Sequence, residues 1–227
     1  MIAWGPLDGE RHKRKRRTRA TISWRDADYL SMRLLLADLR ACRAWARGRL
    51  LDIGCGNQPY RELFAPVIRE YVGLDREWQE RFPDVMGDVL HLPFPAETFD
   101  TVLMIQVLEH VPDPASALSE VRRVLKPGGR VILTAPQYWR VHEEPHDYYR
   151  FTQFGLVHLA QRNGLRVLCV KAQGGAWTLA GQALANTLSA RRVWHRLTPA
   201  VNLLFRACER LWPDAGDPIN HLLVAEK

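Results

Sequence analysis

Short apolar runs alternate with amphipathic segments along most of the chain. The apolar runs have the length of strands, whereas the segments between several of them repeat their apolar residues at helical spacing. This alternation is typical of a parallel sheet built from βαβ units. The pattern predicts seven strands, over residues 49–53, 70–74, 84–86, 101–105, 130–134, 165–170 and 220–225.

The predicted helix between the fourth and fifth strands has the clearest boundaries. Asp113 can cap it, Pro114 suits its first turn, and the Lys-Pro-Gly-Gly segment 126–129 can end it. The stretch between the sixth and seventh strands, 174–216, is too long for a hairpin, so we expect a helical insertion there. Further helices are predicted over residues 26–45, 152–163, 178–189 and 199–211.

Basic side chains are concentrated near the start of the chain. Residues 1–20 carry seven arginines and lysines against two acidic residues, a net +5 of the +7 of the whole chain. Such runs are usually solvated. We therefore expect a basic disordered arm over 1–22 and a single domain over 23–227. An anionic partner for the arm, either RNA or a membrane surface, remains an alternative, and the insertion offers a second route to peripheral membrane contact.

The cysteines and the apolar runs indicate the compartment. The four cysteines are far apart and form no C-x-x-C pair, which argues against a disulfide framework and a zinc knuckle. There is no secretory signal pattern and no uncharged apolar stretch long enough to span a membrane. The sequence therefore predicts a cytoplasmic protein.

A glycine pair and two acidic residues follow three consecutive predicted strands. Gly54 and Gly56 allow a tight turn and close approach of the backbone to a ligand. Asp75, 23 residues after Asp52, can accept hydrogen bonds from both hydroxyls of a ribose. Asp88 can reach an adenine amino group. A dinucleotide site would need a third glycine where Pro59 stands, which disfavours nicotinamide and flavin cofactors.

Five segments, in this order, resemble those of class I methyltransferases that depend on S-adenosylmethionine (SAM), of the type 11 group. They are LLDIGCG (50–56), GLD (73–75), GDVLHLPFP (87–95), FDTVLMIQVLEHVPDP (99–114) and LKPGGRVILTAP (125–136). The resemblance implies a Rossmann-like α/β fold. It further implies a seven-stranded, mostly parallel sheet with its last strand antiparallel and with helices on both faces.

The same resemblance implies SAM as cofactor and S-adenosylhomocysteine as product. It assigns the methionine end to Asp52, Gly54 and Gly56, the ribose to Asp75, the adenine to Asp88 with Val89, and the sulfonium side to Gln106. The full set of expected cofactor-binding residues is Asp52, Gly54, Cys55, Gly56, Asp75, Arg76, Asp88, Val89 and Gln106.

Histidines near two predicted strand ends are candidates for catalysis. SAM carries an activated methyl group, so the protein must align the acceptor and remove a proton from a hydroxyl. His146 is the first choice of base and His142 the second, both in the loop after the fifth strand; His110, in a Glu-His pair after the fourth strand, is a third candidate. The expected acceptor-binding residues are Tyr148, Tyr149 and Arg150.

Structural interpretations of these residues stay open. Arg150 could pair with Asp147 or Glu144 to hold the loop while the tyrosines pack against the following helix, and the Glu-His pair could be purely structural. Glu109 and His110 lack identifiable further metal ligands. The acidic and histidine residues of the loop, from His142 to Asp147, match no ligand pattern, so we expect no metal.

The sequence identifies the methyl acceptor less clearly than the cofactor. The segment HDYYRFT (146–152) resembles one in bacterial methyltransferases of glycan and polyketide-type pathways. We expect a small-molecule, glycan or natural-product acceptor, methylated at oxygen. A nucleic-acid acceptor is disfavoured because Gln106-Val107-Leu108 stands where an Asn-Pro-Pro-Tyr or Asp-Pro-Pro-Tyr motif would be expected. A lipid-linked acceptor and a SAM-binding regulator without turnover are the alternatives.

Overall fold

One sheet organises the part of the chain that the structure describes. The structure is a computed structural model, and it describes residues 20–77, 83–190, 195–214 and 216–227. The predicted basic arm, residues 1–22, therefore lies almost entirely outside the described residues. The strands of the sheet are β1 (Arg49–Ile53), β2 (Glu70–Asp75), β3 (Val85–Met86), β4 (Phe99–Ile105), β5 (Leu125–Pro136), β6 (Arg166–Gln173) and β7 (Asn220–Glu226).

The strand order is β3-β2-β1-β4-β5-β7-β6. The pairs from β3 to β5 are parallel, and β7 lies antiparallel between β5 and β6. The predicted mostly parallel sheet with an antiparallel last strand is thus confirmed. Because the chain builds outward in opposite directions from β1 and β4, the switch point between these strands is where an open α/β sheet binds ligands.

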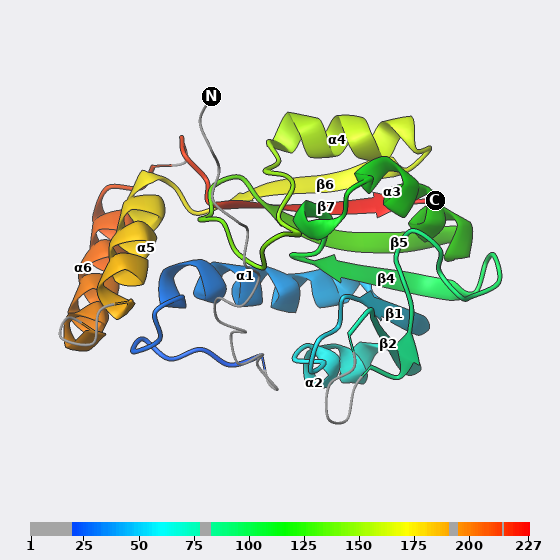
Figure 1. The fold of residues 1–227 in the computed structure, drawn as a ribbon, viewed down its shortest axis with the longest axis horizontal. Coiled ribbons are helices and arrows are strands. Elements are labelled where there is room, and N and C mark those ends of the chain that lie inside the picture. Colours follow the sequence, from blue (N-terminus) through cyan, green and yellow to red (C-terminus); the bar gives the residue numbers. More distant parts are fainter. Residues whose placement is uncertain (1–19, 78–82, 191–194, 215) are drawn as a thin grey trace.

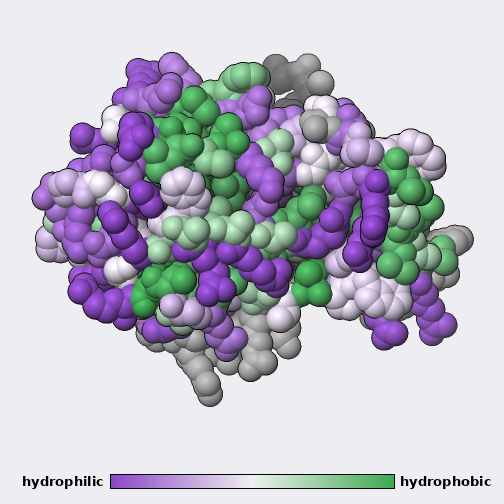
Figure 2. All heavy atoms as spheres, turned by 180° about the vertical axis from the view of Figure 1, so that it is seen from behind, coloured by the Kyte–Doolittle hydropathy of each residue, from purple (hydrophilic) through white to green (hydrophobic). Residues whose placement is uncertain are grey.

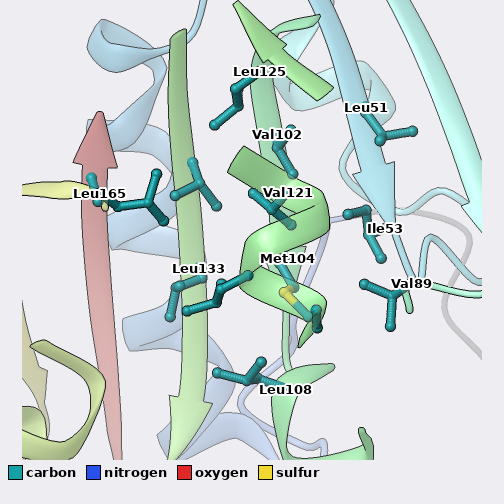
Figure 3. Packing of buried hydrophobic residues seen from close by; sticks show 14 of the residues in the cluster. Leu51, Ile53, Val89, Val102, Met104, Leu108, Val121, Leu125, Leu133 and Leu165 are labelled. Atoms are coloured by element: carbon teal, nitrogen blue, oxygen red, sulfur yellow. The ribbon is translucent and has the colours of Figure 1, made fainter. Parts of the chain in front are cut away.

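Helices cover both faces of the sheet, as expected (Figure 1). The helices α3 (Pro114–Val124) and α4 (Gln153–Arg162) lie on one face, and α1 (Tyr29–Cys42) and the short α2 (Arg61–Phe64) lie on the other. Figure 3 shows the core under α3, where Val121 lies by Val102 and Met104 of β4. Burial of these apolar side chains fixes the strand ends that position the site.

Several predicted boundaries differ from the structure, and at two of them the type of element differs as well. The start of α3 is as predicted, because the Asp113 side chain accepts a hydrogen bond from the Ser116 amide at 3.1 Å. Residues 126–129, however, belong to β5 and do not merely end the helix. Leu125 pairs with Phe99, and a register shift follows before the regular ladder to β4 resumes. Such an irregularity allows a glycine-containing segment to remain within a strand. At the other end of the chain, the helix predicted over 26–45 is α1 followed by a 3-10 turn, Arg43–Trp45.

The two helices predicted between β6 and β7 are present as α5 (Ala176–Ser189) and α6 (Thr198–Leu211). They stand together beside one end of the sheet (Figure 1). Gln182 of α5 accepts a hydrogen bond from the Ser31 amide of α1 at 3.1 Å, and Asn202 of α6 donates to the Trp24 carbonyl at 2.9 Å. The pair packs on α1 and on the segment before it. Within the described residues, no helix combines the length and apolarity needed to cross a membrane.

Candidate active site

A cavity of about 570 Å³ lies at the carboxyl ends of β1, β2 and β4. Its size falls within the usual range for small-molecule sites. Most of the predicted cofactor residues line it, together with residues of α1, the 3-10 turn Leu108–His110 (η3) and the loop after β5. The lining residues from the predicted cofactor set are Gly54, Cys55, Gly56, Asp75, Arg76, Asp88, Val89 and Gln106.

The glycine loop after β1 needs glycine at its first position. Gly54 has a φ of +67°, and a Cβ atom there would lie 2.4 Å from the Cγ2 atom of Val107. The amides of Gly54 and Cys55 both donate to the Leu74 carbonyl, at 2.8 and 3.1 Å, which ties the loop to the end of β2. The left-handed conformation and the close contact together exclude a side chain at position 54.

Two aspartates on the neighbouring strand ends are fixed by backbone amides. Asp75 is buried at the end of β2, where its two oxygens accept from the Gly56 amide at 2.9 Å and the Glu77 amide at 3.1 Å. Asp88 follows β3 and accepts from the Leu90 amide at 2.9 Å. A carboxylate oxygen has a second lone pair, so both side chains retain capacity to accept bonds from a ligand. Asp75 therefore couples the glycine loop to the expected ribose position.

Asp52 is the one predicted cofactor residue that the structure does not bring to the cavity. Its carboxylate is buried and accepts a hydrogen bond from the Tyr71 hydroxyl on β2. Burial raises the pKa of Asp52 to about 7, although the bond from Tyr71 acts in the opposite direction. The expectation that Asp52 lines the methionine end is corrected accordingly, because its side chain is buried beside Tyr71 and is not part of the cavity wall.

Gln106 lies at the end of β4, in the cavity wall. Its backbone is in the left-handed region, with φ of +56°, and its side-chain amide donates to the Thr134 hydroxyl at 3.1 Å. The neighbouring strand β5 therefore holds this side chain in place.

The loop after β5, residues 137–152, is fastened to η3. The amides of Tyr148 and Tyr149 both donate to the Glu109 carbonyl, at 2.9 and 3.2 Å. The Tyr149 hydroxyl donates to the Pro112 carbonyl at 3.0 Å. These bonds bring one edge of the loop to the cavity, where Glu143, His146 and Tyr148 form part of its wall.

Arg150 holds the loop and does not line the cavity. Its guanidinium donates to both oxygens of Asp147, at 2.6 and 2.8 Å, and to the carbonyls of Trp139 and Arg140. Desolvation raises the pKa of Asp147, but the hydrogen bonds from Arg150 and His142 outweigh it and lower that pKa to about 2. The pairing of Arg150 with Asp147 is confirmed. The expectation that Arg150 and Tyr149 form the acceptor pocket is corrected, because both are engaged elsewhere.

The three candidate histidines lie in one neighbourhood, and two of them reach the cavity. His146 lines it, with its Nδ1 atom 2.9 Å from the Tyr148 hydroxyl. His110 also lines it, with its Nδ1 atom 2.7 Å from the His146 carbonyl. His142 lies behind His110, their ring centroids 4.6 Å apart, and is not part of the cavity wall.

One wall of the cavity was missed by sequence reasoning. Met32, Leu35 and Leu36 of α1 line it, although the sequence pattern predicted only that residues 26–45 form a helix. An amphipathic pattern shows that a face is buried but not which cleft it closes. No sequence signal would have located this wall.

Known proteins are similar to this chain over the same region that supplies most of the cavity wall. Residues 51–133 match the family model described as "Methyltransferase domain". A protein of Mycolicibacterium smegmatis, named "Probable S-adenosylmethionine-dependent methyltransferase", is 36% identical over 96 residues, which cover 38% of this chain and 37% of that protein. This chain carries a class I SAM-dependent methyltransferase domain.

Other relatives and solved structures show how much of this chain and of each known protein is matched. The "Ubiquinone/menaquinone biosynthesis C-methyltransferase UbiE" of Burkholderia mallei is 34% identical over 121 residues, 46% of this chain and 50% of that protein. The crystal structure of the [4+2]-cyclase SpnF superposes with a TM-score of 0.62 at 22% identity, over 91% of this chain and 85% of that one, which shows the shared fold. The alignments with the first curated relatives span only 30–39% of their length.

The cavity of the methyltransferase domain fits SAM on its own chemistry. Asp75 and Asp88 offer acceptors for hydroxyl and amino groups, and the positive-φ glycines let backbone approach the ligand. Among the described residues that line the cavity, Arg76 is the one arginine or lysine. A site of this kind suits a ligand without phosphates, as SAM is.

Proposed function

We propose that this chain transfers the methyl group of SAM to a small-molecule, glycan or natural-product acceptor, at an oxygen atom. The observation that carries the proposal is the continuity of one cavity. The glycine loop and the two aspartates line one part of it, and His110, His146 and Tyr148 line another. A bound cofactor and a polar acceptor would therefore share a single space, in which the acceptor oxygen can be aligned with the methyl group.

His146 is the residue that we assign as general base. When bound, SAM supplies a methyl group that is already activated on its sulfonium, and S-adenosylhomocysteine is the product. If the His146 Nδ1–H donates to the Tyr148 hydroxyl oxygen 2.9 Å away, the Nε2 atom keeps a lone pair. That lone pair can accept the proton of an acceptor hydroxyl, so Tyr148 would set the tautomer that the base needs.

The experiment that tests this function uses methyl-labelled SAM. The purified chain is incubated with the labelled cofactor and cell extract, and the extract is then separated into aqueous, lipid and nucleic-acid fractions. We expect the label in a small aqueous product, in an ether or ester linkage. A carbon-bound methyl group, the type named for the Burkholderia relative, would contradict the oxygen assignment. SAM binding without labelling of any fraction would support the regulator alternative.

A lipid-linked acceptor is the second candidate, because α6 exposes a group of apolar side chains. Figure 2 shows apolar residues gathered on the side of the molecule that carries α5 and α6. The exposed fractions on and just after α6 are 47% for Leu203, 59% for Leu204, 67% for Leu211 and 62% for Trp212. Such a surface suits the interface of a membrane that holds the acceptor. The four cysteines, which are far apart in the sequence and form no C-x-x-C pair, support the cytoplasm as the compartment that we propose.

A further inference from the structure

Glu109 is a buried carboxylate whose oxygens have no hydrogen-bond partner. The side chain has an exposed fraction of 0%, and neither Oε1 nor Oε2 accepts a hydrogen bond from the described residues. The bonds that Glu109 accepts from the loop go to its backbone carbonyl. Because buried polar atoms are nearly always paired, a fully buried carboxyl with both oxygens unpaired points to a partner other than the protein.

Two histidines lie next to this carboxylate. Glu109, His110 and His142 each place one possible ligand atom so that the three atoms lie within 4.8 Å of one another. The His110 Nε2 atom is 3.9 Å from Oε1 of Glu109. Ligand atoms that share one zinc ion, each about 2.0–2.2 Å from it, lie roughly 3–4 Å apart. The observed spacing therefore needs only small side-chain adjustments to hold an ion.

The outer partners of both histidines prepare them as ligands. The Nδ1 atom of His110 faces the His146 carbonyl at 2.7 Å, which places its proton on Nδ1 and a lone pair on Nε2. The Nδ1 atom of His142 faces Oδ2 of Asp147 at 3.2 Å. A carbonyl or carboxylate that accepts from a ligating histidine is the usual second layer of a metal site, because that bond fixes the ring orientation.

Contacts of the loop 137–152 also hold the histidines and Glu109 close together. Asp147 is fixed by two hydrogen bonds from Arg150, so the partner of His142 is itself positioned. The backbone bonds from Tyr148 and Tyr149 to Glu109 join the loop to η3, which brings His142 next to a histidine 32 positions earlier in the chain. A network of this kind orders the ligand set before an ion arrives.

We propose that Glu109, His110 and His142 bind one divalent transition-metal ion, of which zinc is the type. Two imidazoles and one carboxylate suit zinc and its first-row neighbours, whereas magnesium and calcium prefer oxygen ligands. Three protein ligands leave a position open, and His110 borders the cavity, so the ion lies at the acceptor end. That the open position holds an acceptor oxygen rests on the proposed methyl transfer; metal binding itself does not.

The test is a metal titration of the full chain without SAM. The protein is stripped with a chelator, and Zn²⁺ is added in a calorimeter, with Co²⁺ absorption as a second readout and Mg²⁺ as the oxygen-preferring control. We expect one Zn²⁺ per chain and the intense visible bands of low-coordinate Co²⁺. Glu109→Gln, which preserves size, and His142→Ala should each weaken Zn²⁺ binding by roughly 100-fold or more, since loss of an outer partner alone costs about 10- to 100-fold.

Two further variants make the test specific to this site. Asp147→Asn removes the charge of the outer partner of His142, weakens its pairing with Arg150, and should lower Zn²⁺ affinity by about 10- to 100-fold. His158→Ala removes an exposed histidine on α4 and should change nothing. Absence of stoichiometric Zn²⁺ binding, or equal binding by the wild type and the folded Glu109→Gln variant, overturns the proposal. SAM affinity is measured in the same calorimeter. A chain that binds SAM but not Zn²⁺ would overturn the metal site alone and leave the proposed methyl transfer standing.

Discussion

The two ends of the cavity are built in different ways. At the cofactor end, the glycine loop follows β1, Asp75 ends β2 and Asp88 follows β3, and backbone amides hold both carboxylates. At the acceptor end, the lining residues come from η3 and from a loop that Asp147 and Arg150 hold in shape. The first arrangement depends on short stretches of sequence, whereas the second depends on contacts between residues that are distant in the chain.

The two ends also differ in how far the family model extends over them. The matched family segment ends at residue 133, before the loop 137–152 begins. The solved [4+2]-cyclase shares the fold, so the fold alone does not decide the reaction. Whatever distinguishes this chain from its relatives is therefore to be sought at the acceptor end, and separate substitutions at the two ends can test whether their roles are distinct.

The largest effect is expected from His146→Ala. Loss of a general base lowers the rate of methyl transfer by roughly 10²- to 10⁴-fold, whereas SAM affinity should stay within about 2-fold, because His146 lies at the acceptor end. The rate is measured on the labelled acceptor fraction, with His158→Ala on the exposed side of α4 as control. A parallel loss of SAM affinity would mean that the two ends are not separable.

Asp75→Asn should act at the opposite end of the cavity. The variant keeps the size of the side chain but removes the charge that accepts ribose hydroxyls, and hydrogen bonds to charged groups contribute about 1.5–3 kcal/mol each. We expect SAM affinity to fall about 100-fold in calorimetry. Glu62→Gln, which changes an exposed carboxylate on α2, is the matched control. Unchanged affinity in Asp75→Asn would remove the ribose assignment.

Asp52→Asn should change the pH dependence of stability. In the folded chain the pKa of Asp52 is raised to about 7 from its ordinary value of 3.8, chiefly by desolvation. The native state therefore keeps this proton at pH values where the unfolded chain has lost it. The stability that Asp52 contributes is fully present below about pH 4 and is lost as the pH rises through about 7.

The variant cannot titrate and should lack this loss. Its free energy of unfolding relative to wild type should increase between pH 5 and pH 8, by roughly 1–3 kcal/mol from the size of the pKa shift. Denaturant titrations at the two pH values measure the difference. SAM affinity at pH 7 should change little, because Asp52 lies under the loop and not in the cavity wall. A difference that is the same at both pH values would show that Asp52 is ionised in the folded chain.

The contrast between local features at the cofactor end and long-range contacts at the acceptor end also determines which site residues could be predicted from the sequence. The glycine loop, Asp75 and Asp88 were predictable, because a strand end and the residues after it are local features. Arg150 was not, since an arginine beside an aspartate fits both an acceptor pocket and a structural ion pair, and only the fold shows which one forms. The proximity of His142 to Glu109 was equally invisible, because it depends on how the loop folds back onto η3.

The smallest expected effect concerns α6. If the exposed apolar group on this helix meets a membrane that carries the acceptor, Leu204→Glu should weaken binding to anionic phospholipid vesicles by roughly 3- to 10-fold, since one leucine contributes at most about 1.5–3 kcal/mol when fully buried. Phe154→Glu is the matched control, because Phe154 is 75% exposed but lies on α4. Equal losses in both variants would indicate nonspecific adsorption. A wild-type chain that does not sediment with vesicles would remove the lipid-linked acceptor and leave the loop and η3 as the surfaces that select a soluble one.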